Sequence, residues 1–206
     1  MIMVTAMMST KSNAQSDSEN SRNKLYVGLK AGINNSNVYD SEGEDFEADA
    51  KVGFVAGGFL AIPIGMYLGI QPEVLFSQKG FKGTGMLLGS QYTMTRTTNY
   101  IDIPLMFSLK PGNVVTLMGG PQFSYLLRQK DEFTNSSTSE AQIQEFENDN
   151  IRRNTLCFLG GIDFNFSNVV IGTRVGWDIQ NNHGDGTSST PRYKNTWLQA
   201  TFGLRF

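Results

Sequence analysis

The chain has 206 residues, a formal net charge of −2 and a charged fraction of 17%. A nearly neutral chain offers no basic field to a polyanion, so nucleic acid is set aside as a partner. With 22 Gly, 14 Phe and 7 Tyr, the composition favours a single Gly- and aromatic-rich β domain.

The first residues predict export. Residues 1–14 begin with a short apolar stretch and end in the small residues of Ser12-Asn-Ala14, so we interpret them as the remnant of a signal peptide. Residues 15–23 are polar and predict a flexible lead-in. No run of 18 apolar residues occurs, which excludes a transmembrane helix and leaves a β-barrel open.

Apolar and polar residues alternate with a period of two from Lys24 onward. This alternation predicts eight strands, at about 24–34, 51–62, 66–79, 92–109, 114–127, 154–165, 169–180 and 197–206. In the second strand the two faces are ambiguous. Matching its Gly57-Gly58 pair to Gly119-Gly120 and Gly160-Gly161 predicts that Val55 and Phe59 face lipid.

The connections between these strands alternate in length. Tight turns at 63–65, 110–113 and 166–168 alternate with long polar segments at 35–50, 80–91, 128–153 and 181–194. Within the third long segment, 140–150 is compatible with a short helix. This order predicts an all-β, eight-stranded antiparallel up-and-down transmembrane β-barrel over 24–206, with four long outer loops and three tight periplasmic turns.

The ionisable residues of the strands share the parity opposite to the apolar residues. A charge on the lipid face at mid-depth costs about 2–4 kcal/mol, so this segregation is typical of a membrane barrel. We therefore expect a paired polar network in the lumen. Its predicted members are Lys30, Glu73, Asp102, Arg174, Asp178 and Arg205.

Three prolines lie inside predicted strands, where each removes a ladder donor. We expect bulges or local breaks near Pro72, Pro104 and Pro121.

The last strand, 197–206, carries apolar residues at every second position and ends in Phe. This pattern is typical of the terminal strand that the barrel-assembly machinery reads. Phe202 and Phe206 are the predicted assembly signal. The predicted location is the outer membrane of a Gram-negative cell, with membrane lipid around the barrel.

No catalytic, cofactor-binding or metal site is predicted. Cys157 lies in an apolar run, and His183 lies in a turn-rich stretch without another His or Cys nearby. Segment 35–50 is acidic but lacks the residue order of a calcium loop. We expect it to contact an extracellular or envelope protein partner.

Four strings resemble the PorT-like outer-membrane β-barrel proteins. They are Leu25-Tyr-Val-Gly-Leu-Lys-Ala-Gly-Ile33, Gln71-Pro-Glu-Val-Leu-Phe-Ser-Gln-Lys-Gly80, Tyr100-Ile-Asp-Ile-Pro-Leu105 and Gly119-Gly-Pro121. The resemblance spans 24–206 and implies a barrel similar in shape to those of OmpA and OmpX, with structural rather than catalytic motifs.

The leading functional hypothesis is a non-enzymatic barrel with a side-chain-filled lumen and a structural or surface-interaction role, within a secretion or uptake complex. The alternatives are a lipocalin-like barrel that binds a small ligand and a narrow selective channel.

Overall fold

The computed structural model describes residues 21–40, 48–87, 90–135, 138–144, 153–180 and 193–206. A short 3-10 helix, η1, precedes nine strands. The elements are η1 (Ser21–Asn23), β1 (Tyr26–Asp40), β2 (Ala48–Ile64), β3 (Leu68–Leu87), β4 (Ser90–Leu109), β5 (Val115–Asn135), β6 (Thr138–Gln144), β7 (Asn154–Phe166), β8 (Val169–Asp178) and β9 (Tyr193–Arg205). No helix in these ranges has the length and apolarity needed to cross a bilayer.

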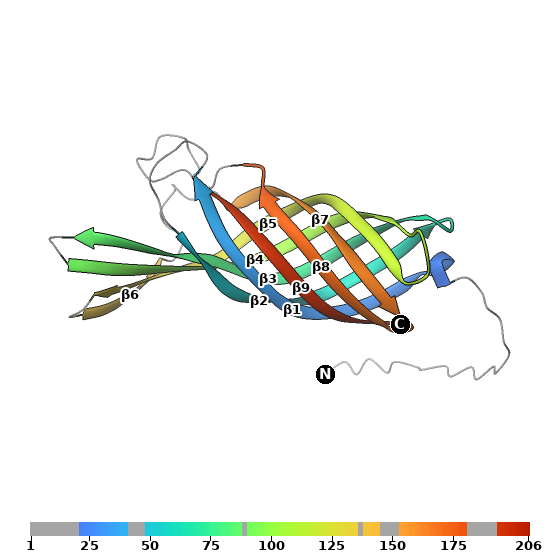
Figure 1. Ribbon diagram of the computed structural model, residues 1–206, viewed down its shortest axis with the longest axis horizontal. Coiled ribbons are helices and arrows are strands. Elements are labelled where there is room, and N and C mark those ends of the chain that lie inside the picture. The colour runs from blue at the N-terminus through green and yellow to red at the C-terminus, as the bar shows by residue number, and fades with distance from the viewer. Residues whose placement is uncertain (1–20, 41–47, 88–89, 136–137, 145–152, 181–192) are drawn as a thin grey trace, which may run out of the picture.

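Eight of the strands form a closed ring in which every neighbouring pair is antiparallel. The ring runs β4-β3-β2-β1-β9-β8-β7-β5 and is closed by the pairing of β4 with β5. The first and last of these strands along the chain pair with each other, from Gly28 opposite Arg205 to Asp40 opposite Tyr193. Figure 1 shows the tilted strands around one axis. The predicted eight-stranded up-and-down barrel is confirmed.

The two faces of the ring have inverted polarity relative to a soluble protein. Large apolar side chains such as Leu29 (65% exposed) and Phe202 (55% exposed) cover the outside, whereas Arg174 is 1% exposed inside. A continuous apolar belt of this size in water would drive aggregation. In a bilayer the same belt meets hydrocarbon, and the polar residues are confined to the lumen.

The predicted faces of the second strand are wrong. Val55 (1% exposed) and Phe59 (6% exposed) point into the lumen, and Phe54 (50% exposed) lies outside. The spacing of glycine pairs does not fix parity, and a shift of one residue exchanges the two faces of a strand.

The three prolines interrupt the ladders without changing their register. In each affected ladder two successive pairs are missing and pairing then resumes at the same offset. The two register shifts lie elsewhere, between Ala50 and Val55 and between Asn99 and Tyr100. The predicted local breaks are therefore present, whereas the bulges are not at the prolines.

All four segments predicted as long loops contain strand residues in their described parts, including 193–194, which begin β9. β3 and β4 stay paired up to Leu87 opposite Ser90, and β6 pairs with β5 from Gln129 to Asn135. The stretch 140–150, which is compatible with a short helix, is a strand over 140–144, where it belongs to β6. Likewise, 35–40 and 48–50 of the acidic segment belong to β1 and β2.

Beyond the apolar belt, β3, β4, β5 and β6 continue as a four-stranded sheet (Figure 1). We call residues 81–87, 90–96, 129–135 and 138–144 the protruding sheet.

The opposite end of the barrel carries the short turns. In the turn between β2 and β3, Gly65 has a φ of 75°, which a residue without Cβ adopts readily. Figure 1 places η1 and the C-terminal end of β9 at this same end. Short turns face the periplasm in outer-membrane barrels, so the protruding sheet faces the cell exterior.

Candidate functional site

The lumen contains an inner cluster formed by Lys30, Glu73, Asp163 and Arg174, one residue from each of β1, β3, β7 and β8. Arg174 donates from Nη1 to both carboxylate oxygens of Glu73, at 2.9 and 2.8 Å. Its Nη2 donates to Oδ2 of Asp163 at 3.2 Å. Lys30 forms a second ion pair with Glu73. Two cations and two carboxylates balance, as burial of charge requires.

A layer of amides and hydroxyls follows along the lumen. Gln199 donates to Oδ1 of Asn34 at 3.0 Å, and Asn34 donates to Oγ of Ser77 at 2.9 Å. These hydrogen bonds join β9, β1 and β3 inside the barrel, and all three side chains are neutral.

A middle cluster comprises Lys79, Asp102, Ser124, Cys157 and Asp178. Lys79 pairs with Oδ2 of Asp102 at 3.1 Å, and the Ser124 hydroxyl donates to Oδ1 of Asp102 at 2.6 Å. The Cys157 thiol donates to Oδ1 of Asp178 at 3.1 Å. The ammonium of Lys79 also lies 3.6 Å from the ring centroid of Trp197, a close cation–π contact.

An outer cluster closes the lumen at the level of the protruding sheet. Arg96 binds Asp131 through two hydrogen bonds of 2.8 and 2.7 Å and donates to Oη of Tyr193 at 2.7 Å. The ring of Tyr193 packs edge-on against Phe81, with centroids 5.3 Å apart. Planar bidentate geometry makes this a strong arginine–carboxylate contact.

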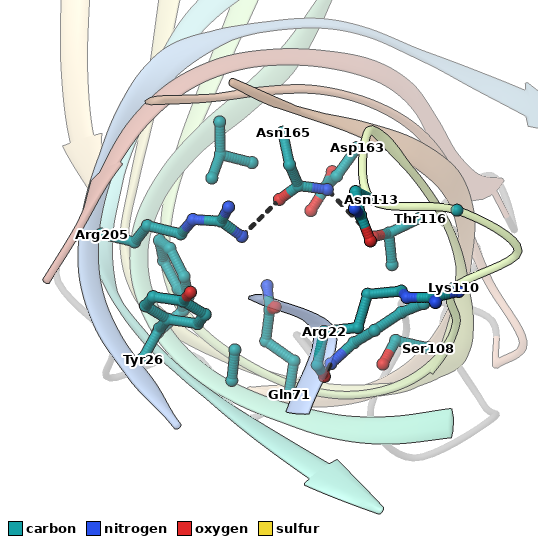
Figure 2. Close-up of a pocket in the computed structure, with 14 residues that line it drawn as sticks. Arg22, Tyr26, Gln71, Ser108, Lys110, Asn113, Thr116, Asp163, Asn165 and Arg205 are labelled. Atoms are coloured by element: carbon teal, nitrogen blue, oxygen red, sulfur yellow. Dashed lines mark hydrogen bonds between the residues drawn. The ribbon is translucent and has the colours of Figure 1, made fainter. Parts of the chain in front are cut away.

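At the short-turn end the lumen opens into a cavity of about 30 Å³. We call it the mouth cavity. Figure 2 shows Arg205 and Lys110 reaching into it from opposite walls, with Asn165 beside Arg205. Arg205 donates to Oδ1 of Asn165 at 2.9 Å and to the Ser167 carbonyl at 2.8 Å. Burial and the positive charge of Arg205 lower the pKa of Lys110.

These clusters fill the barrel rather than line an open path. An eight-stranded ring is just wide enough for its interior to be filled by side chains. Beyond the mouth, a further cavity of about 10 Å³ beside Lys30 and Asp163 has room for roughly one water molecule. Within the described residues, no group of three or more His, Cys, Asp or Glu could hold a metal ion.

The predicted network residues occupy three separate places. Lys30, Glu73 and Arg174 share the inner cluster, while Asp102 and Asp178 belong to the middle cluster. Arg205 joins neither and lies at the mouth. Phe202 and Phe206 are both exposed on the outside of β9 and just beyond it. His183 falls outside the described residues.

Sequence reasoning left several of the clustered residues out. Asp163 and Lys79 share the lumen parity of the predicted members, so parity alone was a sufficient signal for them. Asp131 and Tyr193 lie in segments that look like polar loops. Only the pairing of β5 with β4 brings Asp131 opposite Arg96.

A family model described as the outer membrane protein beta-barrel domain matches residues 13–184. The crystal structure of Ail from Yersinia pestis is 16% identical, with 89% of this chain and 99% of that chain covered and a TM-score of 0.51. Neisserial surface protein A is 13% identical, with 88% and 97% covered and a TM-score of 0.46. A comparison with curated proteins found no match.

At these identities the solved structures show the fold alone. The family model, however, spans most of the chain, from residue 13 to beyond β8. Its match agrees with the closed ring, the apolar belt and the polar lumen described above. The chain belongs to the outer membrane protein beta-barrel domain family, and it is a protein of the outer membrane.

Proposed function

We propose that this protein is a non-enzymatic surface-interaction barrel, in which the filled lumen serves as a rigid anchor and the protruding sheet contacts a partner outside the cell. Such a role suits a component of a secretion or uptake complex. The observation that carries the proposal is the protruding sheet itself, which continues the barrel strands beyond the membrane.

The free edge of β6 is the proposed contact. In the described part of the chain β6 pairs with β5 alone, so its other side presents backbone donors and acceptors. An extended segment of a partner can add to such an edge through main-chain hydrogen bonds.

The negative charge of one outer segment indicates which kind of partner surface it can bind. The acidic stretch from the end of β1 to the start of β2 contains Asp40, Glu42, Glu44, Asp45, Glu47 and Asp49. We propose that it favours a basic protein surface. Ail was solved in complex with the heparin analogue sucrose octasulfate. A polyanion of that kind would be repelled by these acids, so we do not propose one for this chain.

The buried clusters support an anchor over the two alternatives. A narrow channel or a ligand-binding lumen needs free space between the walls, whereas Arg174, Lys79 and Glu73 are almost completely buried. A nucleophile also needs access: Ser124 and Cys157 are buried and bonded to carboxylates, which favours a non-enzymatic role.

Two finer assignments are part of the proposal. The strings at 25–33, 71–80, 100–105 and 119–121 support a place within the PorT-like group. The outward-facing Phe202 and Phe206 support recognition of β9 by the barrel-assembly machinery.

The surface contact is tested by site-specific photo-crosslinking in whole cells. A photoreactive residue at Gln142 in β6 is expected to capture a partner, whereas one at Asn113 in a short turn is not. Equal capture from both positions, or capture from neither, would contradict a contact through β6.

The closed lumen is tested by conductance in planar bilayers. We expect no steady conductance from the wild-type protein and none from Glu73→Gln. A stable, ion-selective conductance that Glu73→Gln alters without changing thermal stability would instead favour the channel.

A further inference from the structure

Three cations line the mouth cavity, Arg22, Lys110 and Arg205, and Lys110 and Arg205 have no carboxylate partner among the described residues. Lys110 Nζ donates to the Arg22 carbonyl at 3.0 Å, and Arg205 donates only to the Asn165 amide oxygen and the Ser167 carbonyl. The one carboxylate lining the cavity is Asp163, which is committed to Arg174 in the balanced inner cluster. Within the part of the chain that the structure describes, the positive charge of Lys110 and Arg205 is therefore not paired with a carboxylate.

The guanidinium of Arg205 lies over the ring of Tyr26, 4.4 Å from its centroid, and lines the cavity. Nε donates to the Ser167 carbonyl and Nη1 to Asn165, which leaves Nη2 without a hydrogen bond in the described structure. The turn that fixes it is itself specialised, because Ser167 has a φ of 53° and Asn168 donates to the Arg205 carbonyl at 3.1 Å. The side chain is thus fixed in place before any ligand arrives.

A second hollow, a groove, shares Tyr26, Asn113, Asn165 and Arg205 with the mouth cavity. It has a volume of about 430 Å³ and is lined by Arg205, Asn165, Asn113, Val114, Phe166 and Ser167. Phe166 is exposed and ends the outward-facing row of β7. A molecule in this groove would touch the exposed Val114 and Phe166 as well as Arg205, while Lys110 lines the adjoining mouth cavity.

This arrangement lies at the level of lipid headgroups. Arg205 is the last residue of β9, and Lys110 follows the last residue of β4, so both stand where the apolar belt ends. Basic pockets at that depth suit anionic headgroups, and a guanidinium N–H such as that of Nη2 forms a charge-assisted hydrogen bond to a phosphate oxygen. The mouth cavity has room for roughly two water molecules, enough for part of a phosphate group.

We propose that Arg205 and Lys110 form a binding site for the phosphate of a phospholipid from the periplasmic leaflet, with the glycerol end of the lipid passing over Phe166. The site is at the opposite end of the barrel from the protruding sheet and does not depend on the proposed surface contact. It gives the anchor a specific lipid at its periplasmic rim.

The test is titration calorimetry on the full chain in a neutral detergent, with three probes: a short-chain phosphatidylglycerol, inorganic phosphate, and a diacylglycerol of the same chain length. The wild-type protein is expected to bind phosphatidylglycerol saturably and more tightly than either other probe. Arg205→Gln is expected to weaken that binding roughly tenfold or more, since it removes a charge-assisted contact. Lys110→Gln is expected to weaken it by a smaller factor.

Arg128→Gln is the matched control, because Arg128 is an exposed arginine of β5 toward the other end of the barrel. It is expected to bind as the wild type does. Equal binding by Arg205→Gln and wild type would overturn the site. Diacylglycerol binding as tightly as phosphatidylglycerol would overturn phosphate recognition. Inorganic phosphate binding as tightly as the lipid would overturn the lipid assignment.

Heat-modifiable migration in gels checks that each variant is folded. Should Arg205→Gln fail to fold, the comparison of the three probes on the wild type and the loss in Lys110→Gln still decide the proposal.

Discussion

Close contact between Gly176 and Trp197 fixes the middle cluster at the scale of single residues. A Cβ added at Gly176 would lie 2.3 Å from a Trp197 ring carbon. That ring in turn faces the ammonium of Lys79. Because Gly176 of β8 has no side chain, the indole of Trp197 can lie against it and face the ammonium of Lys79 from β3.

Gly176→Ala is expected to destabilise the barrel by about 1–3 kcal/mol, because the indole of Trp197 must move. Unfolding in urea, followed by tryptophan fluorescence, measures both the stability and the new environment of the ring. Gly160→Ala is the control, since a Cβ there would have nothing within 4 Å. Similar losses in the two variants would contradict the role given to the Gly176 contact.

Glu73 is the carboxylate on which the inner cluster depends. Glu73→Ala leaves Lys30 and Arg174 buried with Asp163 as their only carboxylate, and we expect a loss of roughly 3–5 kcal/mol in the free energy of unfolding. Glu132→Ala is the control. Its pair with Lys130 is exposed, so we expect no measurable loss of stability from this variant. A small effect of Glu73→Ala in urea titrations would show that the inner cluster contributes little stability.

At the scale of elements, the sequence predicts a strand best where one face meets lipid. The terminal strand alternates without a break, and its predicted faces agree with the exposed Leu198 and Phe202. The faces of the strand at 51–62 are harder to predict, because apolar residues of β2 lie on both faces. Phe54 faces outward and Phe59 faces the lumen. A lumen that accepts aromatic rings weakens the period-two signal.

The protruding sheet was not predictable from periodicity. Outside the membrane both faces of a hairpin meet water, so a strand such as β6 has no apolar row to reveal it. Pairing with β5 supplies the missing information, and that pairing depends on long-range register.

Removing the β5–β6 hairpin is expected to leave the barrel intact. We expect a variant with residues 130–152 replaced by a two-residue Asn-Gly turn to keep heat-modifiable migration, because the inner and middle clusters do not involve this segment. It would lose the Arg96–Asp131 contact and, on our proposal, capture of a surface partner. Failure to insert into membranes would show that the hairpin is needed for folding.

At the scale of the whole molecule, the apolar belt sets the position in the bilayer. Ile162 lies near the middle of the belt on β7, and Leu25 lies just before β1 at the short-turn end. Ile162→Arg is expected to cost about 2–4 kcal/mol and Leu25→Arg about 0–1 kcal/mol. Folding titrations into lipid vesicles measure both. Equal costs would contradict this depth assignment.

The contacts within the lumen could be predicted from the sequence only in part. Parity places ionisable residues in the lumen, but it does not say which of them meet. Arg174 and Glu73 are 101 positions apart and touch, whereas Arg205 shares their parity and lies at the mouth. Ionisable residues of the lumen contact each other only where they lie at the same depth along the barrel. That depth follows from the register of all the strand pairs together.

The pairing of β1 with β9 also bears on how the protein enters the membrane. Asn34 and Gln199, which bond across this seam, are 165 positions apart, so the ring cannot close until nearly the whole chain is in place. An open sheet in hydrocarbon would expose Lys30, Glu73 and Arg174 as well as unpaired strand edges. Closure of the ring and insertion into the membrane must therefore proceed together. Until β9 pairs with β1, the open edges and the lumen charges of a half-inserted intermediate need contact with water or with an assembly factor.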